Sequence, residues 1–326
     1  MSPGAMPFAG TVLQVVPELD AGGAERTTVE IAAAVIAAGG RALVASRGGR
    51  LAAEIERLGG EVTPMPVHSK NPSTILANAR RLEALARANN VDIIHVRSRA
   101  PAWSALFAAR RAGAPLVATH HGAYGAKTPW KRLYNSGLTR ADLVIANSEF
   151  TADAVRRTYP RRADRVVVIP RGADTDVFDP AAVSPERVSA LARAWNASAS
   201  EGAFRILAPG RFTSWKGQED VVDAIALLAG NSSERADSPL PDAGQRRNFE
   251  LVFCGDSQGR RSYTESIERR IEERGVGAMV NIAGHCSDMP AAYAWADLVL
   301  SPSRRPEAFG RVAAEAGAME TLVIAA

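Results

Sequence analysis

One stretch decides the fold class, because it holds a complete strand–helix–strand unit: 142-DLVIANSEFTADAVRRTYPRRADRVVVIP-170. Its two ends are short, continuous apolar runs, and its middle has the spacing of an amphipathic helix over residues 148–158. A strand that is apolar along its whole length is buried on both faces, which is typical of parallel sheets. The stretch therefore predicts two parallel strands joined by a crossover helix.

Similar apolar runs recur along both halves of the chain, with helical patterns between them. In the first half they are 11-TVLQVV, 41-RALVAS, 61-EVTPM, 92-DIIHV and 115-PLVATH. In the second half they are 204-FRILAPG, 249-FELVFCG, 279-MVNIAG, 297-DLVLSPS and 321-TLVIAA. This repetition predicts an α/β protein with two doubly wound, Rossmann-like parallel-sheet domains. Ligands are expected at the carboxyl ends of the strands, in a central cleft between the domains.

Three segments follow from where the alternation stops and resumes. We predict a first domain over residues 1–172, an interdomain connection over 173–203 and a second domain over 204–326. The polar segment 230–248 is interpreted as a surface insertion. The chain ends directly after an apolar strand, and an uncovered strand edge is an aggregation liability. We therefore expect a further helix and interpret the second domain as incomplete.

Composition excludes several classes of protein. The 326 residues carry a net charge of +4, a modest excess that fits a binder of phosphates or of an anionic membrane surface. No long Lys/Arg run is present, so nucleic acid is not expected as a partner. The N-terminus does not read as a secretory signal, and no run of 18 apolar residues indicates a membrane span. Cys254 and Cys286 are interpreted as reduced thiols of a cytoplasmic protein.

The loop after the first strand, 22-GGAER-26, begins with two glycines. Gly22 and Gly23 let backbone amides approach an anion at the start of a helix. The loop does not match the dinucleotide pattern GxGxxG, and Ser46-Arg47 stands where that pattern needs an acidic residue. The alternative is a plain tight turn.

A pair of histidines ends another predicted strand, in 119-THHGAYGAK-127. His120 or His121 could donate a hydrogen bond to a substrate hydroxyl or phosphate. The alternative is a solvated or capping pair. A metal site is not expected there, since no other His or Cys lies at ligand spacing.

Two cations flank the loop in 209-PGRFTSWKGQED-220, between a predicted strand and helix. Arg211 and Lys216, together with the helix dipole, could hold a diphosphate. The alternative is that they are ordinary surface cations.

The segment 303-SRRPEAFGRVAAEA-316 places two glutamates eight positions apart. With a helix that starts near 308, Glu307 lies in the loop at the helix start, and the two residues are about 80° apart around the axis. Glu315 could then accept hydrogen bonds from two ribose hydroxyls, while Glu307 could approach a sugar. The alternative is one first-turn glutamate and one exposed glutamate.

Two further patterns were weighed. Asp174-Thr175-Asp176 spells the metal-binding DxD pattern, but Asx turns explain it equally well, so no metal is predicted. Basic residues with Trp130 and Leu133 between them cluster near 127–133, and a face of this kind either rests on anionic lipid or is solvated.

Taken together, these pieces resemble glycosyltransferase family 4, the retaining transferases of the GT-B fold, over nearly the whole chain. The resemblance rests on six motifs: 22-GGAER, 121-HG, 147-NSEFTADAV, 169-IPRGAD, 210-GRFTSWKG and 302-PSRRPEAFGRVAAEA. The spacing between the two glutamates, with the Arg/Lys loop upstream of it, is the specific part.

The resemblance implies roles for particular residues. Arg211 and Lys216 would hold the donor diphosphate, Glu315 would bind the nucleotide ribose, and Glu307 would contact the donor sugar. His121, more than His120, would lie near the reacting sugar. The remaining residues implied to lie at the donor are Gly22, Gly23, Ala308, Phe309 and Gly310. The implied catalytic set is His121, Arg211, Lys216 and Glu307.

The resemblance also implies a reaction. A hexose would move, with retention and without metal or cofactor, from a nucleotide-diphosphate sugar to a glycan or lipid-linked acceptor. The donor would be GDP-mannose or a UDP-sugar. The chain looks most like bacterial enzymes that build lipopolysaccharide or other envelope polysaccharides, which suggests a cytoplasmic enzyme peripheral on the inner membrane. Two alternatives remain: a GT-B-fold nucleotide-sugar 2-epimerase, and a degenerate sugar-nucleotide binding module without turnover.

Overall fold

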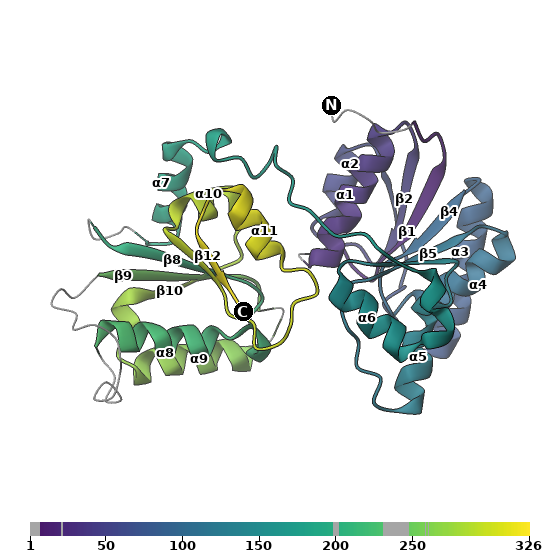
Figure 1. Cartoon of the computed structure of the whole chain (residues 1–326). Helices are drawn as coiled ribbons and strands as arrows, with labels where there is room; N and C mark the ends of the chain where they lie inside the picture. Colours follow the sequence, from purple (N-terminus) through teal and green to yellow (C-terminus); the bar gives the residue numbers. More distant parts are fainter. Residues whose placement is uncertain (1–6, 21, 198–201, 231–247, 258, 260) are drawn as a thin grey trace. The chain divides into compact units, whose positions relative to one another are not determined.

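The computed structural model describes residues 7–20, 22–197, 202–230, 248–257, 259 and 261–326. Most of the predicted insertion at 230–248 lies outside these residues. The chain divides into two compact units, Met1–Arg171 and Gly172–Ala326, and each contains one parallel sheet (Figure 1). The prediction of two doubly wound α/β domains is confirmed.

The sheet of the first unit has seven strands in the order β3-β2-β1-β4-β5-β6-β7. Its strands are β1 (Thr11–Val15), β2 (Arg41–Ser46), β3 (Glu61–Pro64), β4 (Ile93–Val96), β5 (Leu116–His120), β6 (Leu143–Ala146) and β7 (Val166–Val168). All neighbouring strands are parallel. The order reverses between β1 and β4, and in such sheets ligands bind beyond the carboxyl ends of the strands at this switch point.

Helices cover both faces of this sheet. They are α1 (Gly23–Ala37), α2 (Ala52–Arg57), α3 (Pro72–Ala88), α4 (Ala102–Ala112), α5 (Pro129–Thr139) and α6 (Glu149–Thr158), with the 3₁₀ turn η1 (Pro160–Arg165) before β7. Successive residues of β2 enter opposite cores: Leu43 packs with residues of α3 to α6, and Val44 with residues of α1 and α2. The continuous apolar runs of the sequence arise from this double burial.

The sheet of the second unit has five parallel strands in the order β10-β9-β8-β11-β12. Its strands are β8 (Phe204–Pro209), β9 (Phe249–Cys254), β10 (Val280–Gly284), β11 (Leu298–Ser301) and β12 (Val323–Ala325). Its switch point lies between β8 and β11. The loops that follow these two strands therefore meet at one place on the sheet edge.

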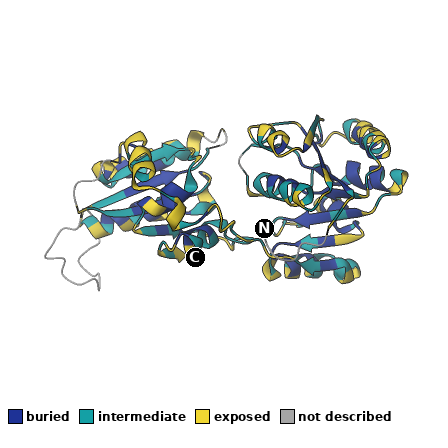
Figure 2. Cartoon of the chain, turned by 90° about the horizontal axis from the view of Figure 1, so that it is seen from above, coloured by how far each residue is buried: buried dark blue, intermediate teal, exposed yellow. Residues whose placement is uncertain are grey.

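The helical segments of the second unit are α7 (Pro185–Ala194), α8 (Gln218–Ala229), α9 (Arg261–Glu273), α10 (Met289–Trp295) and α11 (Arg311–Ala318), with the short 3₁₀ turns η2 (Pro180–Ala182), η3 (Ser214–Lys216) and η5 (Gly277–Met279). α8 and α9 pack on one face of the sheet, and α10 and α11 on the other. Figure 2 shows the buried strands in dark blue between helices whose outer faces are exposed.

The segment that the sequence indicates as a connection packs on the core of the second unit. Trp195, at the end of α7, is 6% exposed and meets Trp295 edge-on, with ring centroids 5.6 Å apart. Phe178 joins the same cluster. Residues Gly172–Ala197 are therefore part of this unit and bury apolar surface against it.

The apolar pattern places the last helix near 310–319, which agrees with the structure, but the start near 308 assumed for the angle between Glu307 and Glu315 is wrong. α11 begins at Arg311, three residues later than that assumed start. Gly310, which precedes it, has a φ of +81°. This left-handed conformation interrupts a right-handed helix and favours glycine. Glu307 consequently lies in a loop four residues before the helix, and a helical angle of 80° to Glu315 does not describe the pair.

Candidate active site

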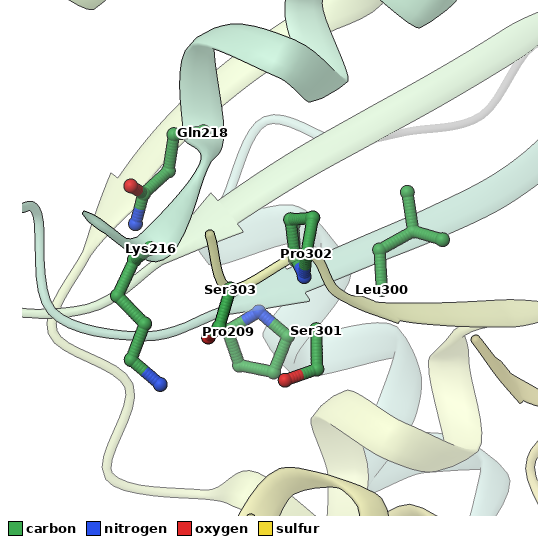
Figure 3. Close-up of a pocket in the computed structure, with 8 residues that line it drawn as sticks. Pro209, Lys216, Gln218, Leu300, Ser301, Pro302 and Ser303 are labelled. Atoms are coloured by element: carbon green, nitrogen blue, oxygen red, sulfur yellow. The ribbon is translucent and has the colours of Figure 1, made fainter. Parts of the chain in front are cut away.

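A small pocket lies at the switch point of the second unit, between residues that follow β8 and residues that follow β11. Figure 3 shows Lys216 and Gln218 on one side of it, and Ser301, Pro302 and Ser303 on the other. Parallel strands bring both loops to the same edge of the sheet, although the two loops are far apart in the sequence. This is where ligands bind in doubly wound sheets.

Lys216 and Glu307, which the sequence predicts as donor-binding residues, are in direct contact here. The Lys216 ammonium group donates a hydrogen bond to the Glu307 carboxylate, and the Ser303 hydroxyl donates to the same oxygen. The ammonium group also lies 4.8 Å from the centre of the Trp215 ring. The cation is therefore held in one place by a carboxylate and an aromatic face.

Gly217 explains how the two loops come so close. Its φ is +73°, and a Cβ atom at this position would lie 2.0 Å from the Pro302 carbonyl oxygen. The backbone amide of Arg304 donates to the Trp215 carbonyl oxygen at 2.8 Å. The Arg304 side chain makes two hydrogen bonds to Asp220, of 2.6 and 2.7 Å. These contacts fasten the β11 loop to the start of α8.

Glu315 projects from α11 and is only 8% exposed. Its Oε1 accepts a hydrogen bond from Arg311 Nε at 2.9 Å, and its Oε2 accepts one from the Tyr293 hydroxyl at 2.9 Å. Burial, followed by the charge of Glu315, raises the pKa of Tyr293 well above its usual value. The alternative interpretation, in which one of the two glutamates is exposed, therefore does not describe Glu315, which is buried and accepts a hydrogen bond at each oxygen.

The other predicted donor residues occupy the same two loops. Arg211 is exposed after β8, and its carbonyl oxygen accepts a hydrogen bond from Gln218 Nε2 at 3.1 Å. Ala308, Phe309 and Gly310 are half-buried in the loop before α11. The structure therefore places all predicted residues of the second unit around one switch point.

A larger cavity of about 540 Å³, which the sequence did not predict, lies beside this site. It is lined by residues that follow β8 and β9, by the end of β10 and by α9, among them Phe212, Asp256, Ser257, Gly284 and His285. Two glycines in the sequence could have indicated this cavity: Gly255, which follows β9, and Gly284, which ends β10. Gly255 allows close packing, since a Cβ atom there would lie 1.9 Å from the Gly210 carbonyl oxygen.

The predicted residues of the first unit lie at its own switch point. His121 Nδ1 contacts the Arg171 guanidinium, which also donates to the Gly23 carbonyl oxygen at 3.1 Å. The Gly22 amide donates to the Glu25 carboxylate at 2.6 Å, which caps the start of α1. In the first glycine loop, therefore, one amide already has a partner in its own helix.

Burial favours the neutral forms of His120 and His121. Burial, followed by the charge of Arg99, lowers the pKa of His120 to about 4. Burial, followed by the charges of Arg97 and Arg171, lowers the pKa of His121 well below its usual value. A neutral imidazole keeps one donor and one acceptor nitrogen, which suits it to contact a sugar hydroxyl.

Sequence reasoning missed the arginines that surround these histidines. Arg97 directly follows β4 and is 1% exposed, and Arg171 follows β7. The signal was present, because Arg97 comes at the carboxyl end of the apolar run 92-DIIHV. That β4 lies beside β1 at the switch point is visible only in the sheet order.

The DxD pattern at Asp174–Asp176 is also located. The backbone amide of Asp176 donates to Asp174 Oδ1 at 3.1 Å, which makes an Asx turn. In the part of the chain that the structure describes, no group of three or more His, Cys, Asp or Glu residues could hold a metal ion. Nor is any described helix long and apolar enough to cross a bilayer.

Comparisons with known proteins agree with this geometry. Residues 21–177 match Glycosyltransferase Family 4, and residues 194–326 match Glycosyl transferases group 1. A glycosyltransferase of Rickettsia africae, known by crystal structure, is 34% identical with a TM-score of 0.81, over 97% of this chain and 79% of that chain. HepE of Anabaena, solved with UDP-glucose, is 25% identical with a TM-score of 0.78, over 97% of this chain and 80% of that chain.

The curated relatives are longer proteins. A D-inositol 3-phosphate glycosyltransferase of Jonesia denitrificans is 30% identical over 261 residues, which are 76% of this chain and 58% of that protein. The chain spans about half the length of the curated relatives it matches. From the two matched families, the two sheets and the Rickettsia structure together, it follows that this chain belongs to glycosyltransferase family 4 and has the GT-B fold.

Proposed function

We propose that the protein transfers a hexose, with retention of configuration, from a nucleotide-diphosphate sugar to an acceptor. The observation that carries the proposal is the position of Lys216 and Glu307, paired at the switch point of the second unit, with Arg211 on the same loop as Lys216. A cation next to a carboxylate suits a ligand that is anionic at one end and hydroxylated at the other. A nucleotide-diphosphate sugar has both ends.

The donor we propose to test first is a UDP-sugar, with GDP-mannose as the second candidate. HepE of Anabaena, which shares the fold, binds UDP-glucose. The cavity of about 540 Å³ beside Arg211 is within the usual size range for small-molecule sites and is our candidate for the nucleoside.

The chemistry proposed for the residues follows from their charges. Arg211 and Lys216 would stabilise the negative charge that develops on the leaving diphosphate, which makes a metal ion unnecessary. Glu307 would accept hydrogen bonds from the donor sugar, and Glu315 from the ribose. His121, as a neutral imidazole, would contact a hydroxyl of the reacting sugar.

Two classes of acceptor have support. The likeness to bacterial envelope enzymes favours a glycan or a lipid-linked acceptor of lipopolysaccharide or another envelope polysaccharide. For the second of these, contact with the inner membrane is supported by Trp130, which is 80% exposed beside Lys131 and Arg132. The names of the curated relatives, D-inositol 3-phosphate glycosyltransferases, favour a small phosphorylated polyol.

Binding calorimetry tests the donor site. UDP, GDP, ADP and their sugar conjugates are titrated into the chain with EDTA present. We expect one nucleotide family to bind, and Glu315→Gln to weaken it about tenfold or more, because that exchange removes a charged acceptor. Glu320→Gln, an exposed position just past the same helix, is the matched control. Equal affinities of the two variants would contradict the assignment of Glu315.

Turnover assays then separate the three functions. A transferase forms a glycosylated product whose anomeric configuration is read by NMR. A 2-epimerase converts the donor with no acceptor present. A binding module gives neither product. Conversion of the donor alone would overturn the transferase proposal, and so would binding without any turnover in the chain extended to the length of its relatives.

A further inference from the structure

Two arginines and a neutral histidine lie at the carboxyl edge of the first unit's sheet. Arg97 follows β4, His121 follows β5 and Arg171 follows β7. Arg171 reaches across the sheet edge to His121 and to the Gly23 carbonyl oxygen. The three side chains therefore come together near the switch point between β1 and β4.

Arg97 is a buried cation with unused hydrogen-bonding capacity. It is 1% exposed, and its Nη1 donates to Gln14 Oε1 at 3.2 Å. Its Nε–H has no hydrogen-bond partner among the residues that the structure describes. Burial, followed by the charge of Arg171, lowers the pKa of Arg97 to about 9, so the guanidinium stays charged at neutral pH. A buried donor without a partner is costly, and a ligand oxygen would remove that cost.

His121 offers a second unused donor. A guanidinium only donates hydrogen bonds, so the contact with Arg171 requires Nδ1 of His121 to be the accepting nitrogen. In the neutral ring the proton is then on Nε2. That atom is buried and likewise lacks a partner within the described part of the chain. Arg97 and His121 therefore both present an N–H group that needs an acceptor.

A second guanidinium, that of Arg171, acts on Arg97. Arg97 and Arg171 repel one another, and Glu30 is the acidic residue that raises the pKa of Arg97. Its side chain is 35% exposed and also lies 4.0 Å from Arg26. The Glu30 carboxylate is thus partly solvated and acts on two arginines, Arg26 and Arg97. An anionic oxygen group is the ligand that charge-assisted donors of this kind bind best.

We infer that the guanidinium groups of Arg97 and Arg171 bind a phosphate monoester carried by the acceptor, next to His121, whose Nε2–H the proposed function assigns to the reacting sugar. The inference rests on the proposed function, in which Arg211 and Lys216 of the second unit already serve the donor diphosphate. It narrows the acceptor to a phosphorylated sugar or polyol.

The test uses the full chain labelled with ¹⁵N at arginine. The Nε–H signal of Arg97 is assigned by its loss in Arg97→Lys. Inorganic phosphate is titrated with and without saturating UDP, whose own binding is measured separately by calorimetry. We expect phosphate to shift the Arg97 signal saturably in both conditions. Arg171→Gln should weaken phosphate about tenfold or more, since it removes one charge-assisted partner.

Arg41→Gln is the matched control, because Arg41 begins β2 at the opposite edge of the same sheet and is exposed. It should leave phosphate affinity unchanged. Unaltered UDP affinity and thermal unfolding of Arg171→Gln show that this variant is folded.

Three results would overturn the inference: an Arg97 signal that phosphate does not shift, equal phosphate affinity of Arg171→Gln and the parent chain, or phosphate binding that UDP abolishes. The last result would assign the anion to the donor. If the parent chain does not bind UDP, the proposed donor site is contradicted. The phosphate titration without UDP would still decide whether the anion site at Arg97 and Arg171 exists.

Discussion

Lys216 and Glu307 are 91 positions apart in the sequence, and their side chains form an ion pair. The pair joins the loop after β8 to the loop after β11, the two strands on either side of the second unit's switch point. Under the proposed function, the carboxylate competes with the donor diphosphate for the same ammonium group. Nucleotide affinity and turnover should therefore respond in opposite directions when Glu307 is changed.

The first prediction concerns this competition. Glu307→Gln removes the negative charge beside Lys216, so affinity for UDP should rise about threefold or more by calorimetry, while transfer of the sugar falls. Lys216→Met should weaken UDP about 10- to 100-fold, the usual range for losing a charge-assisted contact. Lys131→Met, an exposed cation on α5, is the control. Weaker UDP binding in Glu307→Gln would show that the carboxylate does not oppose the diphosphate.

The second prediction concerns the buried carboxylate of Glu315. Glu315→Ala leaves the Tyr293 hydroxyl, in a side chain with 0% exposure, without its hydrogen-bond acceptor. We expect the free energy of unfolding to fall by about 3 kcal/mol. Tyr293→Phe removes the hydroxyl itself and should cost about 1 kcal/mol. Urea unfolding of both single variants and the double variant measures the coupling, and additive costs would refute the contact.

The third prediction compares two glycines with nearly the same backbone angle. Gly217 has a φ of +73° and Gly113 a φ of +75°, but only Gly217 faces a close neighbour, the Pro302 carbonyl oxygen. Gly113→Ala should cost about 1–2 kcal/mol from the left-handed conformation alone. Gly217→Ala has the same cost and a steric clash in addition. It should therefore unfold at a lower urea concentration than Gly113→Ala and bind UDP more weakly. Equal midpoints for the two variants would mean that the loops can separate freely.

The fourth prediction is a pH dependence of the first unit. The folded-state pKa of His120, about 4, lies below the ordinary value of 6.5, so the unfolded chain takes up the proton first as pH falls. The contribution of His120 to stability is complete above pH 6.5 and is lost as pH falls toward 4, by about 3 kcal/mol at most. The free energy of unfolding, measured with urea between pH 4.5 and 7.5, should rise less steeply with pH in His120→Gln than in the parent chain. Parallel slopes would assign the acid sensitivity to other groups.

Much of the fold could be predicted because strands that are buried on both faces of a sheet have continuous apolar sequences. The stretch 142–170 forms β6, α6 and β7 in the predicted order. The start near 308 assumed for the angle between the two glutamates failed, because Gly310 takes a left-handed conformation that depends on the surrounding loop. Local spacing alone placed Glu307 too close to the helix.

The sites show a similar division. Loops that follow strands were identified as binding loops, since that is a rule of parallel sheets. The meeting of Arg97 with His121 and Arg171 could not be read from spacing, because it depends on which strands are neighbours. The same holds for Tyr293 and Glu315, whose contact joins two helices on one face of the second sheet.

The contact between Gly217 and Pro302 also bears on how such an enzyme can diversify. The two loops that carry Lys216 and Glu307 are fixed to one another, so neither can be redesigned without the other. Apart from Phe212, which shares a loop with Lys216, the cavity beyond β9 and β10 is lined by residues outside these two loops, such as Ser257 and His285. Under the proposed function, the preference for one nucleobase can therefore change independently of the diphosphate contacts. A library that varies only the residues of this cavity should change base selectivity while those contacts are kept.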